Sequence, residues 1–353
     1  MRVRTWLPTL AILVTLPHGA RVLLIRLSAL GDVLFGLETL ASLKRERPDL
    51  RCDFLVEDRF ASALLDHPQI ERLLLFPRRT KSRLFRSLCE LRRVRYEAVL
   101  DLQGNLKSAL HTLCARGRRK LGYAAPAARE GAAWFYREKV KITDLTMHRA
   151  ARGYELLKAL GLSGAEARPV LPLPATPPDL WNDAPRPRIV LHPGVSAFGA
   201  FKRWPAARYA QLLSRLVARG LTVAVSHGPG EAELAREVRG ATEPVLSIDG
   251  GALGLVGLAA AYRAADVVVA ADTGPLHLAA AAGTRVVALY GPKDARLYGP
   301  RGEGHQVLSH AVPCRPCTRR TCPSPVCVLG IEVTEVEAAV LETLTSASCR
   351  AGS

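Results

Sequence analysis

Short apolar runs alternate with longer helix-like stretches through most of the chain, and this alternation limits the fold more than any other feature. In the first half the apolar runs are ARVLLIRL, RCDFLV, IERLLLF and YEAVLDLQ. Helical patterns lie between and after them, at residues 34–45, 59–65, 81–95 and 106–116. Strands that alternate with helices in this way are typical of a parallel sheet with helices on both faces.

The same pattern begins again at PRIVLHPG, after the proline-rich segment RPVLPLPATPPDLWNDAPRPR. Proline lacks a backbone donor and fixes φ, so this segment is expected to be an extended linker. A chain of 353 residues can bury two separate cores. We therefore predict an α/β protein with two Rossmann-like, doubly wound parallel-sheet domains at residues 21–165 and 188–345, joined by a linker at 166–187. Ligands of such sheets bind at the carboxyl ends of the strands, which predicts a binding cleft between the domains.

The first twenty residues, MRVRTWLPTLAILVTLPHGA, resemble a signal peptide, because a basic start is followed by an apolar centre and small residues. However, Pro8 and Pro17 bracket an apolar centre that is too short to span a bilayer. An over-long start or a weak membrane-surface segment fits residues 1–20 as well as export does. No other run reaches about 18 uninterrupted apolar residues, so no transmembrane helix is expected.

Positive charge is concentrated in the first half of the chain. The formal net charge is +17, and residues 1–150 contribute +13 of it, from 28 Lys and Arg against 15 Asp and Glu. The densest stretch is PRRTKSRLFRSLCELRRVR, at residues 77–95. Such a stretch attracts phosphorylated ligands or anionic lipid surfaces, although a solvated helix face would have the same composition. Nucleic acid is not expected as a partner, because no recognition module accompanies the charge and aromatic residues make up only 6% of the chain.

Four of the eight cysteines form a C-x2-C-x4-C-x4-C cluster near the end of the chain. Its members are Cys314, Cys317, Cys322 and Cys327. These thiols could ligate zinc or form two disulfides, although the spacing is not that of a standard zinc ribbon. We interpret the cluster as a small structural clasp and expect no metal for catalysis.

The segment VVVAADTGPLHLAAAAGT predicts an anion-binding site in the second half of the chain. Asp272, Thr273 and Gly274 lie where a strand gives way to a helix, and His277 follows one turn later. Unpaired amides and the positive end of the helix dipole suit this position to a phosphate group. Each residue also has a structural interpretation, since Asp272 or Thr273 could simply cap the helix.

Two further loops follow strands and extend this candidate pocket. In LHPGVSAFGAFKRWP, glycines and Ser196 allow close backbone approach to a ligand, and Lys202 adds a cation. In SHGPGE, Glu231 could accept hydrogen bonds from a ribose or serve as a helix-start carboxylate. Three such loops predict a nucleotide pocket. Neither the G-x-G-x-x-G fingerprint nor a Walker motif is present, so hydride transfer and NTP hydrolysis lose their main support.

Several ordered motifs resemble glycosyltransferase family 9, the ADP-heptose:lipopolysaccharide heptosyltransferases. They are RLSALGDVLFGLETLASLKRERPDLRCDFLVEDRF, DLQGNLKSAL, HPGVSAFGAFKRWP, and ADTGPLHLAAAAGT followed by VVALYGP. The resemblance runs from about residue 21 to about residue 340, and the cysteine cluster looks like one found in many members. The segment at residues 1–20 departs from the family, whose members usually begin near the first strand.

This resemblance implies a GT-B fold and an inverting, metal-independent transfer of L-glycero-D-manno-heptose from ADP-heptose to the inner core of lipopolysaccharide. It implies no cofactor. Asp32 would be the catalytic base, Lys202 the partner of the diphosphate, and Asp272, Thr273 and His277 part of the donor site. The acceptor would be a phosphorylated glycolipid, for which we assign Arg78, Arg79, Gln103 and Lys107.

The positive charge of the first half fits a phosphorylated, acidic acceptor. The chemistry of the assigned residues fits as well, since inversion needs only a base on one side and a stabilised diphosphate on the other. The enzyme would act in the cytoplasm, at the inner face of an anionic membrane. Reversing the charges at Arg78, Arg79, Arg83 and Arg86 should then weaken vesicle binding more than ADP binding. Three alternatives stay open: a related transferase with another sugar or acceptor, a non-catalytic sugar-nucleotide binder, and a basic protein that binds nucleic acid.

Overall fold

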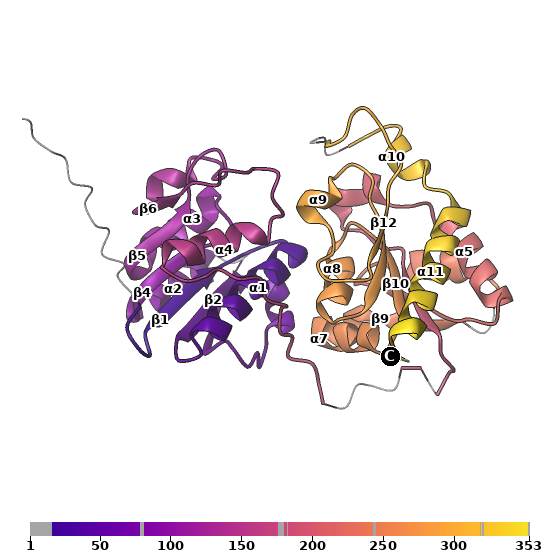
Figure 1. Ribbon diagram of the computed structural model, residues 1–353, viewed down its shortest axis with the longest axis horizontal. Coiled ribbons are helices and arrows are strands. Elements are labelled where there is room, and N and C mark those ends of the chain that lie inside the picture. Colours follow the sequence, from indigo (N-terminus) through magenta and orange to yellow (C-terminus); the bar gives the residue numbers. More distant parts are fainter. Residues whose placement is uncertain are drawn as a thin grey trace, which may run out of the picture.

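The computed structural model describes residues 16–351 except 78–80, 176–179, 182, 243–244, 318 and 320, and the side chains among these except those at 81–84, 197–198 and 347–351. Each half of the chain forms one six-stranded sheet in which every strand pair is parallel (Figure 1). The strand order is β3-β2-β1-β4-β5-β6 in the first sheet and β12-β11-β10-β7-β8-β9 in the second. Two doubly wound sheets confirm the predicted fold class.

The strands are short, as expected for parallel sheets whose two faces are both covered. In the first sheet they are β1 (Arg21–Ile25), β2 (Arg51–Glu57), β3 (Arg72–Phe76), β4 (Arg95–Asp101), β5 (Arg116–Tyr123) and β6 (Glu138–Val140). In the second sheet they are β7 (Arg188–His192), β8 (Thr222–His227), β9 (Leu246–Asp249), β10 (Val267–Ala271), β11 (Arg285–Leu289) and β12 (Gln306–Leu308). The central strands β1 and β10 are almost completely buried, which explains their unbroken apolar sequence.

The principal helices connect these strands. In the first half they are α1 (Leu30–Glu46), α2 (Lys81–Arg93), α3 (Leu106–Cys114) and α4 (Ala151–Ala159). In the second half they are α5 (Ala206–Ala218), α6 (Ala232–Arg239), α7 (Gly250–Arg263), α8 (Gly274–Ala281), α9 (Ala295–Tyr298), α10 (Val326–Leu329) and α11 (Val333–Ala351). Short 3-10 helices η1 (Asp58–Ala63), η2 (Ala132–Phe135) and η3 (Ala197–Lys202) complete the set.

Right-handed crossovers decide which face of the first sheet each helix covers. The chain passes from β1 to β2 in one direction along the sheet, and from β3 to β4 and β4 to β5 in the other. Helices α2 and α3 therefore lie on the face opposite α1, and they pack beside each other. Helix α1 packs on α4 and, from the other half of the chain, on α8. The N-terminus of α1 consequently lies where the two halves meet.

Several elements differ from the sequence expectations. Strand β5 has no apolar signal in the sequence, because its segment RGRRKLGY begins with basic residues at exposed or half-buried positions. The helix expected at residues 59–65 is the short 3-10 helix η1. Helix α11 packs on α5 and extends to Ala351, beyond residue 345, where the second domain was predicted to end.

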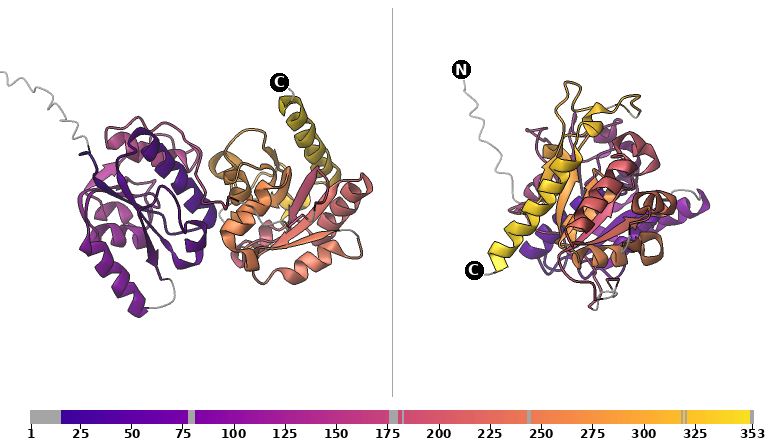
Figure 2. Two further views of the ribbon diagram at one scale, coloured as in Figure 1. Left: turned by 90° about the horizontal axis from the view of Figure 1, so that it is seen from below. Right: turned by 90° about the vertical axis from the view of Figure 1, so that its right-hand side faces the viewer.

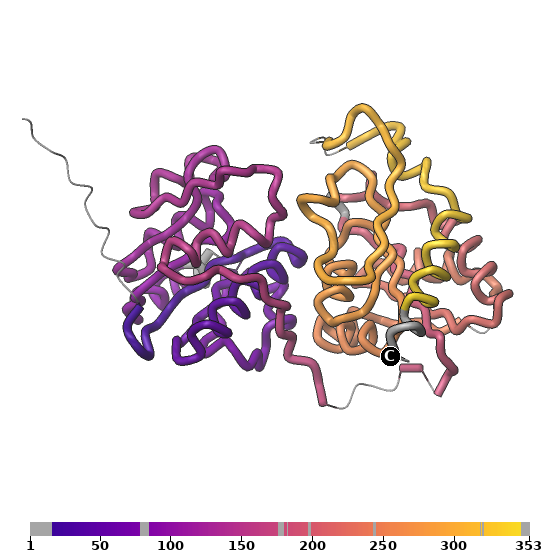
Figure 3. Tube along the Cα trace, in the orientation of Figure 1, coloured from indigo at the N-terminus to yellow at the C-terminus, as the bar shows by residue number. Residues whose placement is uncertain are grey.

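The chain passes between the halves along the proline-rich segment, as the trace in Figure 3 shows, and the halves lie side by side in Figure 2. Of the segment at residues 1–20, residues 1–15 lie outside the described part. Leu16 is buried in the core, and Arg47 Nη1 donates to its carbonyl over 2.9 Å. Within the described residues, no helix is both long enough and apolar enough to cross a membrane.

Candidate active site

Asp32 lies in the first turn of α1, directly after the loop that leaves β1. Its carboxylate pairs with the Arg26 guanidinium and accepts from the backbone N–H of Ala29 at 3.4 Å. About one third of the side chain is exposed. The oxygen Gln103 Oε1 accepts from the backbone N–H groups of Leu27 (2.8 Å) and Ser28 (3.1 Å). Gln103 therefore holds the loop that presents Asp32.

A cavity of about 130 Å³ adjoins Asp32 and is strongly basic. Its lining residues are Arg26, Ser28, Asp32, Leu102, Gln103, Tyr123, Arg129, Arg149, Arg152 and Tyr298. Four of them are arginines, and Asp32 is the one carboxylate among these lining residues. Such a surface binds an anion close to Asp32. We call it the arginine cavity.

The sequence analysis did not single out these four arginines. Arg26 belongs to the motif RLSALGD, and Arg149 and Arg152 lie in the helix-like segment HRAARGYELLKALGL, but neither pattern marks an arginine as a ligand-binding residue. Tyr298 comes from α9 in the second half, and its hydroxyl accepts from Arg149 Nη2 at 3.0 Å. Both halves of the chain thus contribute to the arginine cavity.

The remaining acceptor-side predictions have different outcomes. The amine Lys107 Nζ binds Glu57 Oε1 at 2.7 Å and lies 4.9 Å from the centre of the Phe76 ring, so Lys107 does not line the arginine cavity. Arg78 and Arg79 lie outside the described residues. Of the two predicted acceptor residues that the structure describes, Gln103 lines the arginine cavity and Lys107 does not.

In the second half, the donor-side residues gather at the end of β10. Asp272 forms an ion pair with Lys202 from η3, and Asp272 Oδ1 lies 3.8 Å from His277 Nε2 on α8. Burial alone would raise the pKa of Asp272, but the hydrogen bond from His277 and the charge of Lys202 lower it to about 2. Asp272 therefore stays ionised and holds Lys202 at this edge of the sheet.

Close approach between α1 and α8 joins the two sets of residues. A Cβ atom on Gly274 would lie 2.9 Å from Leu30 Cβ, and one on Gly31 would lie 2.5 Å from His277 Cδ2. Thr273 precedes the first turn of α8, and its hydroxyl donates to the Ala271 carbonyl at 3.1 Å. Two glycines thus allow the helix that carries Asp32 to meet the helix that carries His277.

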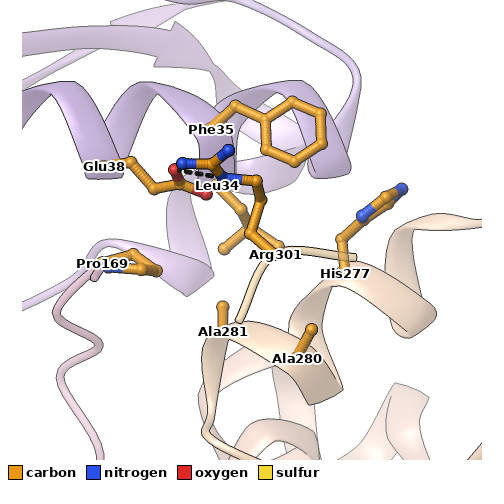
Figure 4. A pocket seen from close by; sticks show the side chains of 8 residues that line it. All are labelled: Leu34, Phe35, Glu38, Pro169, His277, Ala280, Ala281 and Arg301. Atoms are coloured by element: carbon orange, nitrogen blue, oxygen red, sulfur yellow. Dashed lines mark hydrogen bonds and ion pairs between the residues drawn. The ribbon is translucent and has the colours of Figure 1, made fainter. Parts of the chain in front are cut away.

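An ion pair closes the interface two turns further along α1. From the second half, Arg301 Nε binds Glu38 Oε2 at 3.2 Å, and Arg301 Nη2 binds Glu166 Oε2 at 2.8 Å. Figure 4 shows Arg301 and Glu38 facing each other, with His277 on the neighbouring helix. Tyr154 also donates to Glu38, at 3.0 Å. Burial raises the pKa of Glu38, although the charge of Arg301 opposes this shift.

The other two donor predictions lie on neighbouring loops. Glu231 precedes α6, and its Oε2 accepts from the backbone N–H of Gly228 at 2.9 Å. Its carboxylate is 3.9 Å from His192 Nε2. Ser196 is exposed at the start of η3, the same short helix that ends at Lys202. Both residues therefore lie at strand ends, Ser196 after β7 and Glu231 after β8, as predicted.

The cysteine cluster forms neither a disulfide nor a metal centre in the described residues. All four thiols are free, and no group of three or more His, Cys, Asp or Glu residues in the described ranges is arranged to hold a metal ion. Burial, and then the nearby thiols of Cys314 and Cys322, raise the pKa of Cys327. These thiols therefore lie near one another, and the structural clasp stays a prediction.

Acid should destabilise the second half through His192, which is buried and bonded to Ser226 Oγ at 2.9 Å. Burial, with a smaller effect of His227, lowers the pKa of His192 to about 4. An unfolded histidine titrates near 6.5, so this stabilisation is complete above about pH 6.5 and is lost as the pH falls towards 4. The loss is on the order of 3 kcal/mol.

Thermal unfolding measured across this pH range tests the effect. The His192→Gln variant should lose part of the pH dependence, whereas His18→Gln, at a side chain that is 91% exposed, should keep it. Equal slopes for His192→Gln and the wild-type chain would contradict the prediction.

Two parallel-sheet halves that bring a carboxylate and a lysine–aspartate–histidine group to one interface define a GT-B glycosyltransferase. The sequence profile described as "Glycosyltransferase family 9 (heptosyltransferase)" matches residues 83–327. The chain belongs to glycosyltransferase family 9, as its motifs predicted.

Individual relatives agree with this assignment. Lipopolysaccharide heptosyltransferase 1 of Pseudomonas aeruginosa is 31% identical over 322 residues, which cover 86% of this chain and 87% of the relative. Lipopolysaccharide heptosyltransferase 1 of Escherichia coli K12 is 30% identical over 304 residues, covering 81% and 92%. Among solved structures, the E. coli heptosyltransferase WaaC with ADP matches with a TM-score of 0.75 and 26% identity, covering 92% of this chain and 99% of that chain. The enzyme WaaC has also been solved with ADP-2-deoxy-2-fluoro heptose.

Proposed function

We propose that this protein is an inverting heptosyltransferase that transfers L-glycero-D-manno-heptose from ADP-heptose to the phosphorylated inner core of lipopolysaccharide. The observation that carries this proposal is the contact of Gly31 with His277. It sets the Asp32 loop and the arginine cavity of one half against the Asp272 group of the other. The names of the relatives support heptose as the sugar.

On the acceptor side, Asp32 takes the proton from the attacking hydroxyl. The arginine cavity holds a negatively charged group of the acceptor and so fixes where that hydroxyl lies. Arg26 is shared between Asp32 and the cavity. An acceptor anion that draws Arg26 away from Asp32 would leave the carboxylate free to accept the proton, so acceptor binding and activation of the base are linked.

On the donor side, Lys202 and the first-turn amides of α8 stabilise the departing diphosphate. Asp272 positions Lys202, and His277 Nε2 lies 3.8 Å from Asp272 Oδ1. Glu231 accepts hydrogen bonds from the ribose of the nucleotide in this proposal. These roles follow the polarity that inversion requires, a base opposite a stabilised leaving group.

The enzyme would work at the cytoplasmic face of a membrane, where an anionic surface carries the lipid-linked acceptor. The wide basic excess of the first half, 28 Lys and Arg against 15 Asp and Glu in residues 1–150, suits that setting. The partners would be ADP-heptose and the glycolipid, with no cofactor.

Incubation with ADP-heptose and truncated core acceptors tests this function, with ADP release and product mass as the readouts. We expect a product heavier by one heptose. Arg129→Gln, in the arginine cavity, should raise KM for a phosphorylated acceptor without changing ADP affinity. Turnover with a different nucleotide sugar alone would favour the related-transferase alternative, and ADP binding without any turnover would favour a non-catalytic binder.

A further inference from the structure

Helix α3 has the reverse of the usual arrangement of polar and apolar side chains. Its buried positions include Ser108, His111 and Thr112, and these bond to carbonyl groups of the same helix or its cap. A surface helix normally buries its apolar side chains and exposes its polar ones. The exposed positions of α3 are instead Leu106 (39%), Leu110 (43%) and Leu113 (51%). They follow at i, i+4 and i+7, so they form one stripe.

Two exposed aromatic side chains lie on the elements next to this stripe. Trp134, which is 85% exposed, belongs to η2, and η2 packs on α3 through Ala132 and Ala109. Phe85, which is 73% exposed, belongs to α2, the other neighbour of α3. We call these five residues the apolar face: Phe85, Leu106, Leu110, Leu113 and Trp134. Large apolar groups gathered on one side of a protein indicate an interaction surface.

Basic residues lie on the segments that carry the apolar face. Residues 81–141 contain 15 Lys and Arg against 5 Asp and Glu, a net charge of +10. On α2, Arg86, Arg92 and Arg93 are exposed. Near η2, Lys139 Nζ lies 5.8 Å from the centre of the Trp134 ring. A partner with negative charge around an apolar interior therefore complements this surface.

The apolar face adjoins the arginine cavity. Gln103, which lines the cavity, lies two residues before the N-cap of α3, Asn105. Arg129 also lines the cavity and lies five residues before Trp134 in the chain. Its backbone N–H donates to the Gly104 carbonyl at 2.8 Å. A partner held on the apolar face would therefore lie beside the acceptor end of the site.

We propose that the apolar face inserts into the interface of an anionic lipid bilayer, with the stripe of α3 and Trp134 among the acyl chains and the basic residues at the headgroups. Tryptophan favours the membrane interface, and lysine and arginine are attracted to an anionic surface. Docking in this way brings the arginine cavity to the headgroup level. The benefit to catalysis rests on the proposed function, because it needs a lipid-linked acceptor, but binding to lipid does not.

Sedimentation with vesicles tests the proposal, using phosphatidylcholine mixed with phosphatidylglycerol and phosphatidylcholine alone. The double variant Leu110→Gln, Leu113→Gln should partition roughly tenfold more weakly onto the anionic vesicles. The matched control is Leu65→Gln, because Leu65 is 55% exposed and belongs neither to α3 nor to its neighbours α2 and η2. This control should bind as the wild-type chain does.

Trp134 offers an independent readout, because Trp181 and Trp204 are buried. In a Trp6→Phe background, anionic vesicles should shift the tryptophan emission to shorter wavelength, and a Trp134→Phe substitution should abolish the shift. Turnover of a deacylated, water-soluble acceptor should be unchanged in the leucine variant. That measurement separates loss of docking from failure of the proposed function.

Equal vesicle binding by the leucine variant and the wild-type chain would overturn the proposal, as would an unshifted Trp134 emission. A concentration-dependent dimer that the leucine substitutions dissociate, without any lipid binding, would instead assign the apolar face to a second copy of this chain and would also overturn it.

Discussion

Replacing Asp32 with asparagine is expected to lower turnover by about 10²–10⁴-fold, the usual contribution of a positioned base. Asparagine keeps nearly the same size and can still accept the bond from Ala29, so the first turn of α1 should stay intact. ADP affinity should not change, because the proposed donor site lies in the other half. Single-turnover kinetics and calorimetric titration with ADP measure the two quantities separately.

A second carboxylate near α1 provides the control for this variant. Asp49 lies beyond the far end of the helix and binds Arg47, so Asp49→Asn should leave turnover unaffected. Retention of most of the wild-type turnover by Asp32→Asn would remove Asp32 from the role of base. Loss of ADP binding in the same variant would show instead that the substitution disturbs the interface between the halves.

Replacing Lys202 with alanine is expected to lower turnover by about 10²–10³-fold, as removal of one group that stabilises developing charge commonly does. ADP affinity should fall as well, because the diphosphate loses its cation. The substitution also removes the lysine partner of Asp272, whose side chain is mostly buried. An unpaired buried charge should reduce the free energy of unfolding by on the order of 1–3 kcal/mol.

Stability and catalysis can be separated in this variant by a second substitution. Adding Asp272→Asn removes the unpaired charge, so thermal unfolding should return towards the wild-type temperature while turnover stays low. If the double variant recovered turnover, Lys202 would be only a structural partner of Asp272. If neither variant changed ADP affinity, the diphosphate would bind elsewhere.

The sequence predicted the fold because strand and helix patterns are local. The apolar runs that became β1, β2, β7 and β10 are buried on both faces, and such strands leave a strong signal. Strand β5 left none, because its first residues are basic and only its second half is buried. Helix α7 was also missed, since Gly250, Gly251 and Gly254 interrupt its pattern and Gly254 has a non-helical backbone.

Candidate site residues at strand ends could be predicted from the sequence for a similar reason. A residue that follows a buried strand lies at the carboxyl edge of the sheet wherever that strand is placed, as Asp32 and Asp272 do. Lys107 also lies near that edge, but only the structure shows its bond to Glu57. The position of a residue in the sequence thus predicts that it lies at the carboxyl edge of the sheet, but not which side chain it binds there.

The sequence alone indicates two parallel α/β halves, a basic first half and a set of family motifs at the strand ends. Only the tertiary structure assembled the arginine cavity, because Arg26, Arg129 and Tyr298 lie far apart in the chain and meet through the contact of the two halves. It alone showed which side of α3 faces outwards, since the helical pattern fixes which residues share a face but not which face the sheet covers. Local sequence sets the periodicity of helices and strands. The pairing of charged side chains and the exposure of a helix face depend on neighbouring residues that folding brings together.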